Sequence, residues 1–178
     1  MITIRSTRSH SFLLAAGIFA AAFLLAGCGR QQDGYKSGDN TVTIARPKSG
    51  SNEIGLQNER VAIPPGANPV ESALTRLFQT ADEPDKASAI PKGTRLLDLK
   101  VEGGIARINV SKEWNALKSH GSTTESLAEN ALRITLAQFP EIQKMLLIVE
   151  GRPFESEHAD WSEPIPVRES NAAAGGAP

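Results

Sequence analysis

The densest group of side chains that could do chemistry lies near the C-terminal end of the chain. Glu155, Glu157, His158 and Asp160 place three carboxylates and one imidazole within six residues, and such oxygen and nitrogen donors can hold a divalent cation. The frame of an EF-hand, with acids at fixed odd positions around a central glycine, is missing. We therefore interpret this segment as a solvated acidic loop and predict no metal site.

No nucleophile for acyl transfer is recognisable in the sequence. A G-x-S-x-G turn is absent, and Ser49 and Ser51 lie in a polar stretch without a strand-turn-helix context. His120 lies in a polar loop, and a hairpin turn explains Gly103 and Gly104 better than a phosphate cradle does. The residues thus predict no catalytic site and no cofactor.

Two tryptophans and two glutamates remain as candidates. Trp114 and Trp161 could anchor an interface, because tryptophan often dominates protein contacts; we favour packing against the core or a sheet edge. Glu125 and Glu129 are four residues apart and share a face of a predicted helix. We interpret Glu125 as a capping residue and Glu129 as solvated, so neither is expected to act in a site.

The single cysteine, Cys28, lies at the end of a targeting signal. Two arginines and no acids precede an apolar run, residues 12–26, which is shorter than the ~20 residues of a membrane-spanning helix. Residues 25–28 read Leu-Ala-Gly-Cys and resemble the bacterial lipobox, where a peptidase cuts before an acylated cysteine. We therefore predict a lipoprotein signal peptide at 1–27 and lipid attachment at Cys28, with acyl chains such as palmitate holding the protein on a membrane. The alternative is a plain signal peptide or an uncleaved anchor.

Composition and charge exclude several classes of protein. The 178 residues are 40% hydrophobic and 22% charged, which is typical of a globular protein. Nineteen basic side chains nearly balance twenty acidic ones, so no basic field is available to bind nucleic acid. One cysteine excludes an internal disulfide framework and a cysteine-rich metal site.

The segments after the signal differ in composition. Residues 28–40 are polar and rich in glycine, which predicts a flexible tether. Small residues dominate the end of the chain, and we expect a disordered tail at 169–178. Between them, 41–168 is long enough for one domain.

Strand and helix patterns alternate within this domain. Strands are predicted at 41–46, 59–63, 97–101, 106–110 and 145–149, and helices from Asn68-Pro69 and from the capping box 122–125, the second ending before Pro140. Leu97, Leu99 and Val101 alternate with polar residues and are expected to form a buried face. The order β-β-α-β-β-α-β, followed by an extended segment, predicts an α/β (α+β) sandwich. Its sheet is mixed and mainly antiparallel, with two helices packed on one face.

A series of short motifs follows the same order. It comprises 90–97 (IPKGTRLL), 101–111 (VEGGIARINVS), 136–140 (LAQFP), 148–151 (IVEG) and 160–165 (DWSEPI). Together they resemble the GerMN domain of bacterial sporulation and germination lipoproteins, over about 42–167. The resemblance implies a non-catalytic envelope module that takes part in assemblies at the membrane surface.

We therefore expect a lipid-anchored protein on the extracytoplasmic side of the cell membrane, without enzymatic activity. Its expected partners are the membrane, through the acyl chains on Cys28, and other envelope proteins. Its expected role is protein-protein assembly, and the resemblance implies a link to sporulation or germination. The alternative is a cell-wall glycan-active enzyme or a ligand-binding lipoprotein. A glycosidase would need two carboxylates in a cleft, for which Glu155, Glu157 and Asp160 are the candidates.

Overall fold

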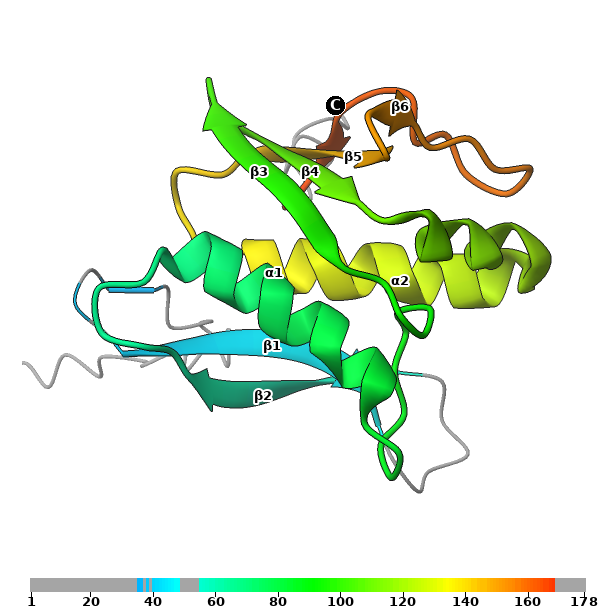
Figure 1. Ribbon diagram of the computed structural model, residues 1–178. Coiled ribbons are helices and arrows are strands. Elements are labelled where there is room, and N and C mark those ends of the chain that lie inside the picture. Colours follow the sequence, from blue (N-terminus) through cyan, green and yellow to red (C-terminus); the bar gives the residue numbers. More distant parts are fainter. Residues whose placement is uncertain (1–34, 37, 39, 49–54, 169–178) are drawn as a thin grey trace, which may run out of the picture. The chain divides into compact units, whose positions relative to one another are not determined.

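The computed structural model describes residues 35, 36, 38, 40–48 and 55–168, which all belong to one structural unit (Figure 1). Cys28, the signal peptide and the tail at 169–178 lie outside the described residues. The elements are β1 (Thr41–Pro47), β2 (Leu56–Ala62), α1 (Pro69–Gln79), the 3-10 helix η1 (Thr80–Asp82), β3 (Leu96–Glu102), β4 (Ile105–Val110), the 3-10 helix η2 (Lys112–Ser119), α2 (Gly121–Leu136), β5 (Lys144–Val149), β6 (Arg152–Pro153) and β7 (Ile165–Pro166).

The strands divide into two sheets, with the helices α1 and α2 between them (Figure 1). β1 and β2 form a two-stranded antiparallel sheet. The larger sheet has the order β3-β4-β5-β6, with β7 also paired to β5. Only β4 and β5 run parallel in it, because α2 carries the chain back across the sheet between them. The predicted element order and the α+β class with a mixed, mainly antiparallel sheet are confirmed. The prediction placed all strands in one sheet, whereas β1 and β2 form a second sheet that also contacts α1 and α2.

Side chains of α2 and of the turn after it form hydrogen bonds with the edge of β1 that does not pair with β2. Thr43 donates its backbone N–H to Gln138 Oε1 (2.9 Å) and accepts from Gln138 Nε2 at its carbonyl oxygen (2.7 Å). Ala45 donates its N–H to Thr135 Oγ1 (3.0 Å). Because buried backbone groups need partners, these bonds replace the strand that would otherwise pair with this edge of β1.

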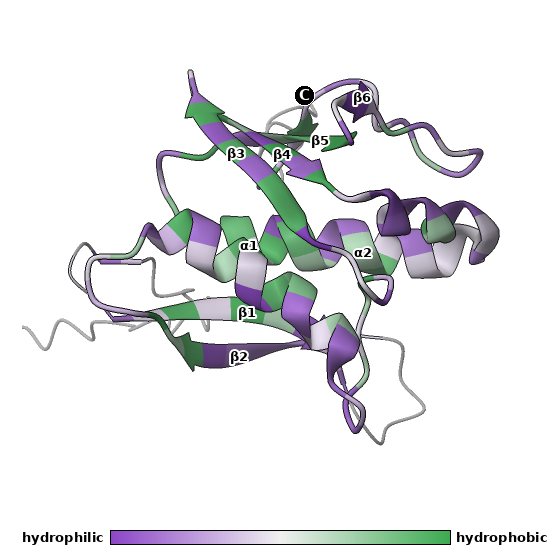
Figure 2. Cartoon of the chain, in the orientation of Figure 1, coloured by the Kyte–Doolittle hydropathy of each residue, from purple (hydrophilic) through white to green (hydrophobic). Residues whose placement is uncertain are grey.

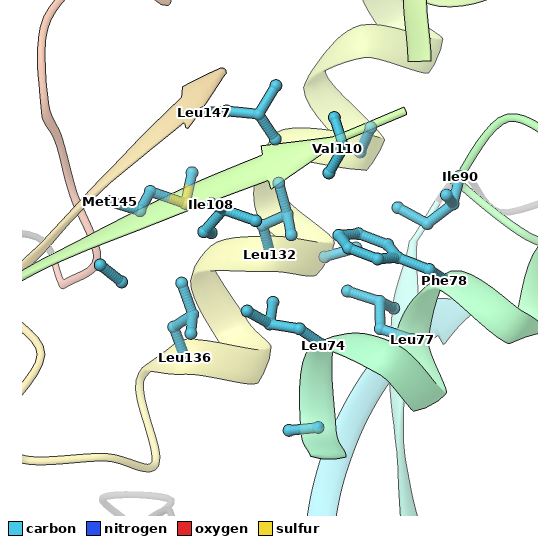
Figure 3. Close-up of a cluster of buried hydrophobic side chains, with 14 of the residues drawn as sticks. Leu74, Leu77, Phe78, Ile90, Ile108, Val110, Leu132, Leu136, Met145 and Leu147 are labelled. Atoms are coloured by element: carbon cyan, nitrogen blue, oxygen red, sulfur yellow. The ribbon is translucent and has the colours of Figure 1, made fainter. Parts of the chain in front are cut away.

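The core includes buried side chains of both helices, of the larger sheet and of the β1–β2 sheet, and Figure 3 shows the part between the helices and the larger sheet. Leu74 and Phe78 of α1 point toward Leu132 of α2 and toward Ile108 of β4 (Figure 3), and each of these side chains is at most 1% exposed. Each helix buries one apolar face. Besides Glu125, the buried residues are Val70, Ala73, Leu74, Leu77 and Phe78 in α1, and Ala128, Ala131, Leu132, Thr135 and Leu136 in α2, whereas Leu127 is only partly buried.

The two helices begin differently. Asn68 caps α1 as predicted, since its side-chain oxygen accepts from the N–H groups of Val70 (3.0 Å) and Glu71 (3.1 Å). The predicted capping box at 122–125 is wrong. α2 starts at Gly121 after His120, no side chain caps it, and Glu125 points into the protein instead.

The first and last described segments both contact the end of α2. Tyr35 donates its N–H to the carbonyl of Gln138 (2.9 Å), and its ring centroid lies 5.5 Å from that of Phe139. Arg168 donates to the carbonyl oxygens of Ile142 (2.8 Å), Ala137 (2.6 Å) and Phe139 (2.7 Å). A guanidinium is well suited to the C-terminal end of a helix, where carbonyl groups lack partners.

Candidate functional site

The acidic segment near the C-terminus forms a loop that is folded on its own hydrogen bonds. Ser156 Oγ accepts from the N–H groups of His158 and Ala159, both at 3.1 Å. Asp160 accepts from the N–H of Ser162 at 2.9 Å, and the side-chain and backbone hydrogen bonds from Ser162 lower the pKa of Asp160. Residues 154–162 line a shallow hollow of about 500 Å³.

The four candidate metal ligands of the loop are not brought together. Glu155, Glu157, His158 and Asp160 are exposed side chains. Within the part of the chain that the structure describes, no three histidine, cysteine, aspartate or glutamate side chains are placed so that they could hold an ion.

A buried glutamate lies under this loop and holds it to α2. Glu125 is 1% exposed, and its Oε1 accepts from Trp161 Nε1 (2.5 Å) and from the hydroxyl of Ser156. The sequence interpretation of Glu125 as a helix cap is wrong. The sequence does indicate that Glu125 faces the core. Glu125 precedes Ala128 and Leu132 by three and seven residues, and so lies on the apolar face of α2.

Both tryptophans belong to an aromatic cluster beside Glu125. The Trp114 ring lies edge-on to Trp161 (6.1 Å between centroids), to Phe154 (6.3 Å) and to Phe78 (6.2 Å). Neither tryptophan is more than 1% exposed. The packing interpretation is confirmed, and the two indoles join η2 and the C-terminal loop to the core.

The remaining sequence candidates have local structural roles. His120 is exposed and lies between η2 and α2, with its Nδ1 2.5 Å from the carbonyl oxygen of Ala116. Glu129 is partly buried rather than solvated, and burial raises its pKa although Arg133 lies 3.9 Å away.

A second group of charges holds the β1–β2 sheet to the turn after α1. The buried Arg46 Nη1 lies 2.8 Å from Glu59 Oε2 and 3.2 Å from Glu83 Oε2, and Arg76 lies 2.6 Å from Glu83 Oε1. Partial burial raises the pKa of Glu83, but the hydrogen bonds from Arg76 and Arg46 outweigh it and lower that pKa to about 2. The group therefore stabilises the fold.

The outer strand of the larger sheet carries the exposed apolar surface. β3 pairs with β4 on one side, and no strand pairs with its other side within the described residues. Leu97 is 52% and Val101 40% exposed, and Leu99 is partly exposed. The prediction of a buried face on this strand is wrong, because β3 lies at the sheet edge and the register shifts between Leu96 and Asp98. Hydrophobic and hydrophilic residues follow one another along β3 in Figure 2. We call Leu96–Glu102 the β3 edge.

None of the helices in the described ranges is both long enough and apolar enough to cross a membrane.

A match to a family model identifies the family of this chain. The model of the family described as Germane, for sporulation and spore germination, matches residues 41–155, more than half of the chain. This protein therefore belongs to the Germane family, and the resemblance to the GerMN domain is confirmed. No curated protein matches the chain.

Solved structures share this fold. The first GerMN domain of the sporulation protein GerM from Bacillus subtilis matches with a TM-score of 0.51 and 20% identity over 74% of this chain and 97% of that chain. The tandem GerMN domains of the same protein match with a TM-score of 0.51 and 20% identity, over 73% of this chain and 45% of that chain. A candidate lipoprotein from Clostridium perfringens matches with a TM-score of 0.47 and 21% identity, over 72% of this chain and 88% of that chain.

Proposed function

We propose that this protein is a lipid-anchored module on the extracytoplasmic side of the cell membrane, and that it works by binding other envelope proteins rather than by catalysis. The β3 edge is the observation that carries the proposal. Exposed backbone groups at a sheet edge can bind an added strand, and Leu97 and Val101 offer apolar surface beside them.

The arrangement of the acidic loop supports a role without catalysis. In Glu125, the buried carboxylate beside the loop, Oε1 accepts from Trp161 and Ser156, and Oε2 has no hydrogen-bond partner among the described residues. The acids Glu155, Glu157 and Asp160 are exposed side chains around one open hollow, and they do not form the buried pair of carboxylates in a cleft that a glycosidase uses. The residues of this region serve the packing of the loop.

The anchor rests on the sequence around Cys28. The proposed arrangement is a signal peptide at 1–27, an acylated Cys28, a tether that ends near residue 40, a domain at 41–168 and a tail at 169–178. The Germane family is described by sporulation and spore germination, which favours a place in the envelope of a bacterium that forms spores.

Metabolic labelling with an alkyne-tagged fatty acid tests the anchor. The full chain, expressed in a bacterium, should incorporate the label and give a mature protein whose first residue is Cys28. Cys28→Ser should incorporate none, because Cys28 is the only cysteine. An unlabelled parent chain, or label retained in Cys28→Ser, would refute the proposed anchor.

A further inference from the structure

We propose that the β3 edge binds the β3 edge of a second copy of this chain, in an antiparallel pairing that joins two larger sheets across a two-fold axis at Leu99. The proposal names the partner of the surface on which the proposed function rests.

The fold leaves an apolar face of β3 partly uncovered. Leu99 lies opposite Ile108 and Val101 opposite Ala106 in the β3–β4 ladder. Residues opposite each other share a face of the sheet, so Leu99 and Val101 lie on the core side. Ile108 and Ala106 are fully buried, whereas Val101 is 40% exposed. A neighbouring strand with apolar residues at matching positions would cover this surface.

The other face of β3 carries charged side chains at Asp98 and Lys100. Asp98 lies opposite Asn109, and Lys100 opposite Arg107. The pairing of Lys100 with Arg107 brings two like charges together, which is unfavourable in a ladder. Neither Asp98 nor Lys100 forms an ion pair with any described residue. An acidic side chain from a partner beside Lys100 would relieve the repulsion.

The sequence of β3 supplies that partner when it is paired with itself. Two antiparallel copies with Leu99 at the axis place Asp98 opposite Lys100 twice, and the two Leu99 side chains opposite each other on the core side. Leu97 lies at the register shift of β3 and is left out of this comparison. Another register that keeps the same side chains on each face of the joined sheet moves the two-fold axis by one residue. With the axis at Lys100, two lysines meet and Asp98 faces Glu102; with the axis at Asp98, two aspartates meet. With the axis at Val101, Lys100 would face Glu102, but only residues 100–102 of β3 would be paired, because the strand ends at Glu102. The register centred on Leu99 pairs opposite charges and spans the whole of β3.

The closed two-fold arrangement also fits the usual symmetry of homo-oligomers. Both copies use the same surface, and no edge of β3 is left to recruit further chains. The β3 edge is short, so we expect a weak dimer in solution. Confinement to a membrane, as the proposed function requires, would raise the effective concentration and favour pairing.

Disulfide crosslinking of the full chain, purified in detergent micelles, tests the register. Leu99→Cys places two thiols at the axis, where opposing Cβ atoms of antiparallel strands are about 4.5–5.5 Å apart. A mild oxidant should convert Leu99→Cys to a covalent dimer at least about fivefold faster than Thr75→Cys, an exposed control on α1. The parent chain gives the baseline for Cys28.

Charge exchange in the Leu99→Cys background tests the pairing of the faces. Asp98→Lys and Lys100→Asp should each slow crosslinking, with dimer dissociation constants about tenfold higher, because two attractive pairs become repulsive. The double variant Asp98→Lys/Lys100→Asp should recover the parent rate, because it restores opposite charges in the same register. Melting curves of all variants verify that the fold is kept.

The outcomes separate this proposal from the proposed function. Crosslinking of Leu99→Cys no faster than Thr75→Cys, or a double variant that stays as slow as the single ones, would overturn the self-pairing. Crosslinking of Leu99→Cys to a different protein in intact membranes would also overturn it, while leaving the β3 edge as a docking surface. Fatty-acid labelling of Cys28 is unaffected by any of these results, so loss of the anchor and loss of the dimer are measured independently.

Discussion

Replacing Gln138 with leucine should loosen the β1–β2 sheet from α2. The Gln138 carboxamide is 8% exposed and makes three hydrogen bonds, to the N–H and the carbonyl of Thr43 and to the carbonyl of Thr135 (2.6 Å). Leucine has a similar volume but no polar atoms, so both backbone groups of Thr43 lose their partner. An unpaired buried polar group costs about 1–3 kcal/mol.

The expected loss of stability is smaller than the largest cost of leaving both backbone groups of Thr43 unpaired. Thr43 is only partly buried, so water reaches its groups in part, and the added apolar surface of leucine offsets some of the penalty. We expect Gln138→Leu to lower the free energy of unfolding by about 2–3 kcal/mol, which corresponds to a melting temperature lower by roughly 10 °C for a domain of this size.

Two measurements check this prediction. Thermal unfolding followed by circular dichroism gives the global effect, with Gln79→Leu as the matched control, because Gln79 is exposed on α1. Hydrogen exchange then locates it, since the Thr43 amide should lose protection more than the amides of β4. A Gln138→Leu protein that melts with the Gln79→Leu control would refute the role of the carboxamide in holding β1.

Two further predictions concern charge and packing. Because the folded state lowers the pKa of Glu83 to about 2, its carboxylate stabilises the fold above its unfolded pKa, and this contribution is lost as the pH falls from about 4.5 toward about 2. In urea unfolding at pH 7, Glu83→Gln should therefore be less stable than the parent by about 1–2 kcal/mol, after allowance for the partial exposure of Glu83. Near pH 2 the two proteins should be equally stable. A constant difference in stability across this pH range would contradict the ion pairs. Leu132→Ala should lower the free energy of unfolding by about 2–5 kcal/mol, because Leu132 is fully buried between α1 and β4, and an unchanged urea midpoint would contradict the packing in Figure 3.

Local patterns predicted the elements and their order. The apolar stripes of α1 and α2 recur at helical spacing, and Asn68-Pro69 marks a helix start by chemistry that acts within four residues. The β3–β4 hairpin follows from its glycine turn in the same way, since Gly103 and Gly104 both adopt positive φ angles. Such signals depend on near neighbours, so a single sequence reveals them.

The features that the sequence did not predict depend on distant contacts. Gln138 reaches Thr43 across 95 positions, and Glu125 reaches Trp161 across 36. No local pattern distinguishes a glutamate that caps a helix from one that accepts an indole N–H of a later loop. The exposure of Leu97 and Val101 likewise depends on the place of β3 in the sheet, because alternation predicts an apolar face and not what covers it.

The bonds from Arg168 have a practical consequence for the limits of the folded unit. The family match ends at residue 155, yet the last described side chain, Arg168, ties β7 and the turn after α2 together through three carbonyl groups. A fragment cut at the end of the match would lack this guanidinium and also Trp161, and it would expose the indole of Trp114 and the carboxylate of Glu125. A shortened chain for biophysical work must therefore extend through Arg168.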